Sequence, residues 1–151
     1  MLILGLSIGD ERYGVEATQV IEVVPLISLR KVPLADKCIR GIFNYRGYPT
    51  PVVDLCQLFE NRNCVNNLST RIIIVEYTAL SGIKRSIGLI AEKITNVMSC
   101  EANEMENSGI HQDQNDFLGL IYTHNTEMIQ LIDTNKILPD SISNQLMSEM
   151  V

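Results

Sequence analysis

The chain has 151 residues, of which 46% are hydrophobic, and its formal net charge is −6. This length and composition are enough for a sizeable hydrophobic core. No apolar run approaches the ~20 residues that a membrane-spanning helix needs, which argues against insertion into a bilayer. The 12 basic residues are scattered, so binding to nucleic acid is not expected either.

The opening residues Met1–Leu6 lack the basic start of a secretory signal and are expected to form a strand. Four cysteines, Cys38, Cys56, Cys64 and Cys100, show no metal-ligand spacing. We therefore expect reduced thiols in a cytoplasmic protein, with no bound metal.

Short β-branched runs between turn residues predict a chain made mostly of strands. In chain order these are expected at residues 2–8, 12–16, 20–24, 28–32, 39–45, 48–53, 71–77, 86–91, 95–98, 117–123 and 128–132. Short helical pieces are expected at 17–19, 55–59 and 134–138, and polar loops at 60–68 and 99–116. The tail 141–151 is expected to form a helix or to fray. Such spacing favours small barrels or a sandwich.

The segment 39–55 predicts a strand, a tight turn, a second strand and the start of a helix. Gly47 can supply the positive φ of a two-residue hairpin turn. Pro49 and Pro51 cannot donate to a ladder, so the second strand is expected at an edge or with its N–H side free. Asp54 is expected to cap the helix that follows.

The same plan occurs twice along the chain. Residues 13–24 align with 87–98, which places Gly14 on Gly88, and residues 52–54 align with 131–133. Asp54 and Asp133, which end these two segments, are each expected to begin a short helix. Two related β units in tandem would leave a groove between them, although short apolar runs also align by chance.

Nothing along the chain forms a recognisable catalytic constellation. His111 and His124 have no Cys or Ser partner at a recognisable spacing. Asp54 and Asp133 are a conceivable carboxylate pair, but capping is the stronger interpretation of their places. Cys56 is interpreted as core filler rather than a nucleophile. No phosphate loop is present and no cofactor is expected.

Two charged residues stand out from their surroundings. Glu22 interrupts the apolar run 20–24, and Arg46 occupies the hairpin turn. They are either an exposed strand face and a solvated turn, or an ion pair that locks two strands together. Spacing alone leaves both interpretations open.

The sequence resembles the CheW family, the adaptors of bacterial chemotaxis-type signalling arrays. The family's strongest motif is matched by Gly-Ile-Phe-Asn-Tyr-Arg-Gly at 41–47 and by Pro-Val-Val-Asp-Leu at 51–55. Tyr-Gly-Val at 13–15 and Ile-Gly-Leu at 87–89 match its two halves. The Asn-Tyr-Arg-Gly variant resembles adaptors of systems that govern surface-associated behaviour.

The resemblance implies an all-β fold of two five-stranded, SH3-like barrels with a groove between them. It implies one CheW-like domain over residues 1–151, made of two intertwined subdomains, with a C-terminal tail at about 139–151. Departures from the family pattern are Tyr45 in place of Leu, Cys56 in place of a polar residue, and Arg71 in place of Val.

The resemblance also implies partners and contact residues. Glu22 and Arg46 match a structural ion pair, and the receptor-binding residues are Ala17, Val20, Glu22 and Arg46. Arg40 and Gly41 match contacts to the regulatory domain of a CheA-like histidine kinase. The structural motif residues are Asn44, Arg46, Gly47, Pro51 and Asp54.

The expected function is therefore a non-enzymatic, cytoplasmic adaptor between a chemoreceptor's cytoplasmic tip and the kinase. It would lie at the membrane only through protein contacts with receptor arrays. The alternative is a small-molecule sensor or small enzyme that uses the inter-barrel groove as a pocket.

Overall fold

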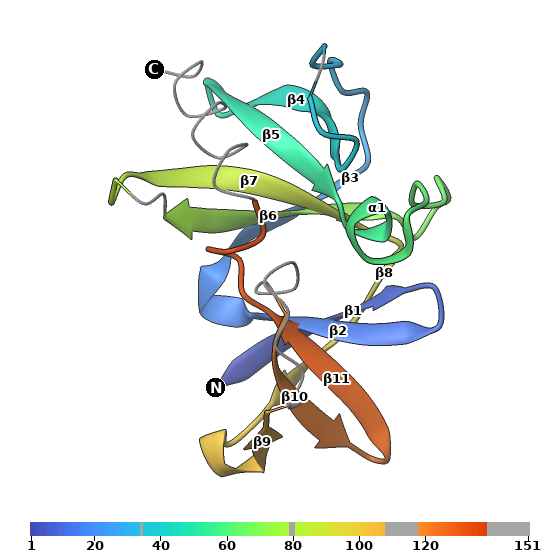
Figure 1. The fold of residues 1–151 in the computed structure, drawn as a ribbon, viewed down its shortest axis with the longest axis vertical. Coiled ribbons are helices and arrows are strands. Elements are labelled where there is room, and N and C mark those ends of the chain that lie inside the picture. The colour runs from blue at the N-terminus through green and yellow to red at the C-terminus, as the bar shows by residue number, and fades with distance from the viewer. Residues whose placement is uncertain (34, 79–80, 108–117, 139–151) are drawn as a thin grey trace.

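The computed structural model describes residues 1–33, 35–78, 81–107 and 118–138, and shows two curled sheets packed one above the other (Figure 1). The strands are β1 (Leu2–Ile8), β2 (Glu11–Glu16), β3 (Val20–Pro25), β4 (Ile39–Tyr45), β5 (Tyr48–Asp54), β6 (Arg71–Thr78), β7 (Lys84–Ala91), β8 (Lys93–Ser99), β9 (Met105–Glu106), β10 (Leu118–His124) and β11 (Glu127–Ile132). One α-helix, α1 (Leu55–Glu60), and two 3-10 turns, η1 (Ala17–Gln19) and η2 (Ala102–Glu104), complete the described elements. The predicted all-β class is confirmed.

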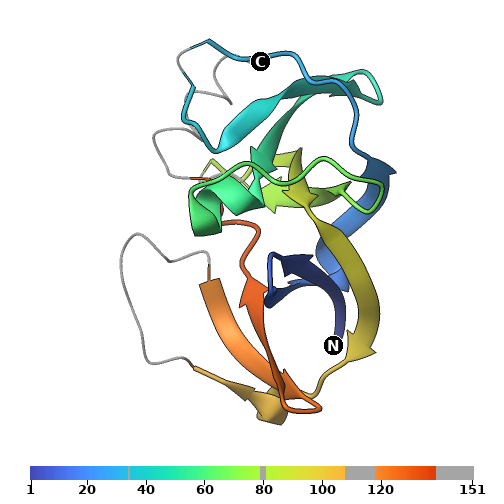
Figure 2. The same cartoon turned by 90° about the vertical axis from the view of Figure 1, so that its right-hand side faces the viewer.

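Each barrel draws strands from both halves of the chain. The five-stranded barrel has the order β3-β6-β7-β5-β4, and the six-stranded barrel has the order β8-β1-β2-β11-β10-β9. The expectation of five strands in each barrel is therefore wrong for one of them, because the two-residue β9 adds an edge beside β10. Figure 2 shows β8 descending from one barrel to the other.

The strand registers confirm the internal repeat and correct its arrangement. Leu131 of β11 lies opposite Gly14 of β2 in a parallel pair. Val52 of β5 lies opposite Gly88 of β7 in the same kind of pair. These are the positions that the repeat aligns. The parallel partner comes from the other half of the chain in both barrels, so the two units are intertwined rather than simply in tandem.

The two repeat-related glycines are required by close packing. A Cβ atom on Gly14 would lie 2.5 Å from Cγ2 of Ile3, and one on Gly88 would lie 2.8 Å from Cγ2 of Ile72. Both isoleucines are fully buried. Since a β-branched methyl group beside the backbone cannot swing away, no larger residue fits at either glycine.

The main core joins the two barrels. It contains Leu4, Leu6 and Ile8 of β1 together with the buried faces of β6 and β7. Ile137 and Leu138, which follow the last strand, are buried in the same cluster. A smaller core of Ile3, Met98, Cys100, Tyr122 and Ile129 fills the six-stranded barrel. Shared burial ties the barrels into one body.

The hairpin between β4 and β5 forms as predicted. Arg46 and Gly47 both have positive φ, at 53° and 89°, as a two-residue turn of this kind needs. Asn44 fixes the turn because its Oδ1 accepts the Gly47 N–H at 2.8 Å. β5 is not an edge strand, since it lies between β7 and β4. Pro49 and Pro51 are tolerated because pairing with β7 begins only at Val52.

Three predicted elements differ from the structure. Residues 28–32 form no strand, only a single bridge between Arg30 and Ile42. Residues 134–138 form turns rather than a helix, because Asp133 Oδ1 accepts the Asn135 N–H in a local turn at 3.1 Å. The expected loop 99–116 contains η2 and β9 in its described part. The tail 141–151, expected to form a helix or to fray, lies outside the described residues. Within the described ranges no helix is long and apolar enough to cross a membrane.

Replacing Gly14 with Ala should therefore destabilise the fold by about 1–3 kcal/mol through overpacking. Gly119→Ala is the matched control, since its Cβ would meet its nearest atom at an ordinary 3.5 Å. Urea denaturation at neutral pH measures both variants. Equal stability of the two would contradict the close-packing account.

Candidate functional site

The seam of the five-stranded barrel lies between its edge strands β3 and β4, and polar side chains bridge it. Tyr45 donates its hydroxyl to Glu22 Oε2 at 2.6 Å. Arg46 Nη2 lies 3.3 Å from the same oxygen, and its guanidinium lies 5.2 Å from the Tyr45 ring centroid. The hydrogen bond to Glu22 raises the pKa of Tyr45. Tyr45, a departure from the family's usual Leu, thus gains a partner across the seam.

The Glu22–Arg46 ion pair forms but is not buried. The Arg46 side chain is 67% exposed and that of Glu22 is 41% exposed. Solvent-exposed ion pairs contribute at most about 1 kcal/mol. The pair therefore joins β3 to the hairpin without being a major source of stability.

The two faces of β3 differ in what they offer to a partner. Val20 is half-buried and packs against the main core, whereas Ile21 and Val23 are 43% and 39% exposed. Ala17 lies on η1, where Glu16 and Gln19 border a cavity of about 250 Å³. The apolar side chains available on this strand are therefore Ile21 and Val23, which the sequence analysis did not single out.

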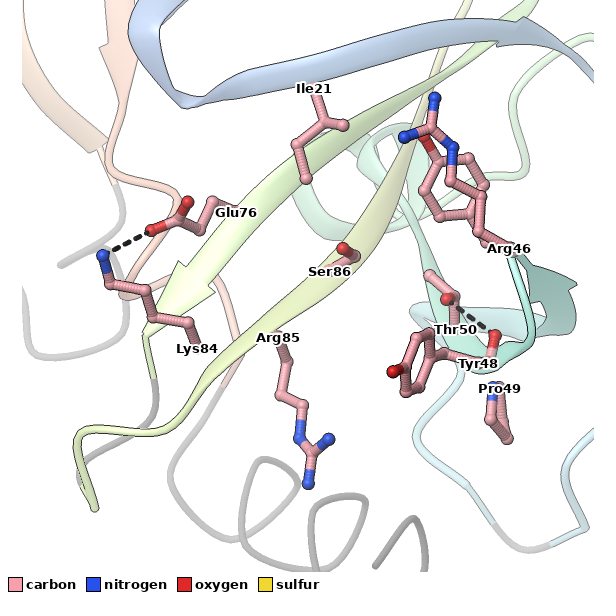
Figure 3. Close-up of a pocket in the computed structure, with 10 residues that line it drawn as sticks. Ile21, Arg46, Tyr48, Pro49, Thr50, Glu76, Lys84, Arg85 and Ser86 are labelled. Carbon is pink, nitrogen blue, oxygen red and sulfur yellow. Dashed lines mark hydrogen bonds and ion pairs between the residues drawn. The ribbon is translucent and has the colours of Figure 1, made fainter.

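A larger cavity of about 430 Å³ opens at the hairpin end of the same barrel (Figure 3). Figure 3 shows Ile21 above it, with Lys84 paired to Glu76 on one side and Arg46 on the other. The lining residues are Ile21, Tyr45, Arg46, Tyr48, Pro49, Thr50, Glu76, Lys84, Arg85 and Ser86. Among these residues, Thr50 donates to the Tyr48 carbonyl and Glu76 pairs with Lys84, so neither is arranged as a nucleophile–base pair.

At the opposite end of β4, the buried carboxylate of Asp54 organises the local backbone. It is fully buried and caps α1, since Oδ1 accepts the N–H groups of Cys56 at 2.9 Å and Gln57 at 3.3 Å. Oδ2 accepts the Cys64 N–H at 3.1 Å and pairs with Arg40 Nη1 at 2.7 Å. The predicted cap is confirmed, and Asp54 also holds Arg40 in place.

Gly41 is explained by packing within the chain. A Cβ atom there would lie 2.7 Å from the carbonyl oxygen of Arg30 and 2.8 Å from Cβ of Leu29. Any side chain at this position would displace the 29–30 segment. A bulky substitution of Gly41 would therefore disturb the fold before it reached any partner.

Cys56 and Cys64 are bonded to each other as a disulfide, which corrects the expectation that all four cysteines are reduced. Cys38 and Cys100 are free and buried. Asp54, Cys56 and Cys64 form a compact group of metal-ligand types. The donor set does not suit a metal, because the sulfurs bond each other and both Asp54 oxygens already accept hydrogen bonds.

Glu92 is a structural residue that the sequence analysis missed. Its carboxylate takes both terminal nitrogens of Arg62, at 2.8 and 2.9 Å, and the Val65 N–H at 2.8 Å. It also accepts the Gly9 N–H, at 2.9 Å, from the turn between β1 and β2 in the other barrel. The bond to Arg62 lowers the pKa of Glu92 to about 2. Glu92 thus clamps the two barrels together.

His124 and Asp133, considered above for chemistry, have structural neighbours instead. His124 Nδ1 lies 3.2 Å from the Tyr122 hydroxyl at the end of β10. Asp133 accepts the backbone N–H of Asn135 in a turn. His111 lies outside the described residues.

The described residues thus form two intertwined β-barrels with cavities open at the surface. The CheW-like domain model matches residues 2–141, so the chain belongs to the CheW-like domain family.

Relatives agree with this assignment. The chemotaxis protein CheW of Bacillus subtilis is 26% identical over 140 residues, covering 91% of this chain and 86% of the relative. That of Helicobacter pylori is 31% identical over 74 residues, covering 49% and 45% respectively. The crystal structure of the scaffolding protein TtCheW from Thermoanaerobacter tengcongensis is 30% identical with a TM-score of 0.80, covering 91% of this chain and 87% of that one.

Removing one partner of the exposed pair tests its energetic role. Arg46→Ala should lower the free energy of unfolding by less than about 1 kcal/mol. Tyr45→Phe should cost about 1–2 kcal/mol, because it removes a hydrogen bond to a charged group. Chemical denaturation of both variants compares them, and a larger loss for Arg46→Ala would show that the ion pair dominates.

The clamp at Glu92 makes stability depend on pH. Its folded pKa of about 2 lies below the ordinary 4.5, so its contribution is complete above pH 4.5 and is lost as the pH falls towards 2. Glu92→Gln should cost about 1–3 kcal/mol at pH 7 and much less near pH 2. Glu127→Gln is the control, since its ion pair with Arg12 leaves Glu127 56% exposed. Denaturation at both pH values checks this, and an equal loss at the two would contradict it.

Proposed function

We propose that the chain is a non-enzymatic adaptor that couples chemoreceptors to a CheA-like histidine kinase in chemotaxis-type signal transduction. The observation that carries this proposal is the match to the CheW-like family over residues 2–141, with the fold of a scaffolding protein over 91% of the chain. The absence of a nucleophile–base pair from the 430 Å³ cavity supports a contact role. No observation favours the small-enzyme alternative.

The receptor-binding surface is proposed to be the β3 side of the five-stranded barrel. It comprises Ala17, Val20, Glu22 and Arg46, with the exposed Ile21 and Val23 supplying its apolar contacts. A receptor tip built as a helical hairpin would present an apolar stripe with polar flanks to such a surface. Arg46 and Ile21 both border the 430 Å³ cavity, which supports a recessed contact there.

The kinase-binding surface is proposed at the start of β4, around Arg40 and Gly41. Arg40 is 31% exposed and borders a cavity of about 280 Å³ with Ile27 and Lys31. Gly41 leaves room for the 29–30 segment, which the adjacent Ile42 holds through two backbone hydrogen bonds with Arg30. The five residue-to-residue steps from Arg40 to Tyr45 span roughly 17 Å along a strand, so the two surfaces are distinct.

The mechanism that follows is geometric. Two partners bound at opposite ends of one rigid barrel are held in a fixed relation to each other. A receptor that favours one conformation can then bias the kinase through differential contacts. We propose that residues 1–151 act as one domain in the cytoplasm, attached to receptor arrays through these protein contacts.

Ile21→Glu tests the receptor surface. Replacing a central apolar residue of an interface can cost about 2 kcal/mol or more of binding free energy. The affinity for a receptor-tip fragment should therefore fall at least about tenfold. Affinity for the kinase regulatory domain should be unchanged. Calorimetric titration with each partner measures this, and Met128→Glu, at an exposed site on the other barrel, is the control. Equal loss of both partners would reject the separation of surfaces.

Ile27→Glu tests the kinase surface in the same titrations. Ile27 is 45% exposed beside Arg40, so the substitution should leave the fold intact. Kinase affinity should fall about tenfold while receptor affinity is retained. Retained kinase binding in the folded variant would place this contact elsewhere.

A further inference from the structure

The Cys56–Cys64 disulfide lies next to the proposed kinase surface. Cys56 lies on the buried face of α1, and Cys64 lies in the segment between α1 and β6. The backbone N–H groups of both cysteines donate to Asp54, at 2.9 and 3.1 Å. Asp54 Oδ2 also pairs with Arg40 at 2.7 Å. One buried carboxylate therefore connects the disulfide to Arg40.

Cys64 is itself buried, at 4% exposed, so access to the bond needs a local opening around this residue. Its neighbours Asn63 and Val65 are exposed, and Leu68 further along is 95% exposed. Because the neighbours of Cys64 bury little side-chain surface, a small opening confined to Cys64, between the Glu92-bonded Arg62 and Val65, need not unfold a barrel. Cys56, which is fully buried on α1, would stay in place during such an opening.

The proposed cytoplasmic location gives a reason why the Cys56–Cys64 disulfide would form and break reversibly. Disulfides in cytoplasmic proteins of mesophiles are usually transient, with catalytic or redox-sensing roles. The proposed function places this chain in the cytoplasm. A disulfide joined to a binding surface fits a sensing role better than a purely structural one.

We propose that Cys56 and Cys64 form a thiol–disulfide exchange site that regulates the Arg40 end of β4. Its substrates are low-molecular-weight disulfides, such as oxidised glutathione, and dithiol reductants. The cytoplasmic location and the effect on kinase binding both rest on the proposed function, whereas the Cys56–Cys64 bond and its link to Asp54 are read from the structure.

The chemistry balances as two exchanges. The Cys64 thiolate attacks the small disulfide, forming a mixed disulfide and releasing one thiol, which takes the proton lost from Cys64. The Cys56 thiolate then attacks the Cys64 sulfur and releases the second thiol, which takes the Cys56 proton. Overall, two cysteine thiols are oxidised and one small disulfide is reduced to two thiols. A dithiol reverses the sequence.

The two remaining cysteines are poor competitors for this reaction. Burial, with the nearby Asp36, raises the pKa of Cys38 to about 12. Burial also raises the pKa of Cys100. Both thiols are therefore almost entirely protonated at neutral pH and unreactive as nucleophiles.

Reduction has a structural consequence at Asp54. Two thiols need more room than a bonded pair, and the close-packed core around Cys56 provides none. Arg62 and Val65 remain tied to Glu92, so the adjustment falls on Cys64. Its N–H then leaves Asp54, which loosens the placement of Arg40.

The test uses the full chain equilibrated in glutathione buffers of defined redox ratio. Alkylation of free thiols followed by mass spectrometry should show two thiols in the oxidised protein and four in the reduced one. Amide hydrogen exchange should be at least tenfold faster at Cys64 and Gln57 after reduction. Affinity for the kinase regulatory domain should be a few-fold lower in the reduced state.

Two variants sharpen the test. Cys64→Ala should behave like the reduced protein in every buffer, and Cys100→Ala should respond like the parent. A pair that never oxidises, or that resists a dithiol in the folded protein, would overturn the exchange site. Unchanged hydrogen exchange between the two states would overturn the link to Asp54. Failure of both states to bind the kinase domain would count against the proposed function, with the exchange site judged by the first two readouts.

Discussion

Glu92 is the single residue between β7 and β8, at the point where the chain passes from the five-stranded barrel to the six-stranded one. Its carboxylate holds Arg62 and Val65 of one barrel and the Gly9 turn of the other. The crossing is therefore anchored from both sides. Because each barrel also takes its parallel strand from the other half of the chain, neither can move without disturbing its partner. The relation between the proposed binding surfaces follows from this constraint.

The segment between α1 and β6 connects the two buried or partly buried carboxylates. Cys64 donates to Asp54, while its near neighbours Arg62 and Val65 donate to Glu92. Asp54 in turn positions Arg40. A movement of Cys64 can therefore displace Asp54 and Arg40 at the start of β4, whereas the contacts of Glu92 between the barrels are kept. The Asp54–Arg40 contact can therefore adjust while the Glu92 contacts hold the two barrels in a fixed relation.

Features set by local sequence could be predicted, and those set by distant contacts could not. The hairpin at Arg46–Gly47 and the Asp54 cap depend on residues within a few positions of each other. The pairing of Cys56 with Cys64 and the clamp at Glu92 depend on how loops meet in space. Residues 28–32 have the composition of a strand, yet make only one bridge to Ile42.

In the candidate site, too, the local motif could be predicted from the sequence, whereas burial and exposure could not. The family motif pointed to Glu22 and Arg46, and the structure brings them together at 3.3 Å. It could not reveal that they are exposed, because exposure depends on how the barrel seam closes. Nor could the motif distinguish Val20 from Ile21, since the burial of alternate β3 residues depends on which face meets the core. Repeat alignment did locate Gly14 and Gly88, since both meet a buried isoleucine from a neighbouring strand.

The central claim is that one chain holds a receptor tip and a kinase at the same time through separate surfaces. The most direct measurement is sedimentation velocity on a mixture of the chain, a receptor-tip fragment and the kinase regulatory domain. The account predicts a ternary complex whose formation requires the chain. Two binary complexes that exclude each other at saturating concentrations would contradict it.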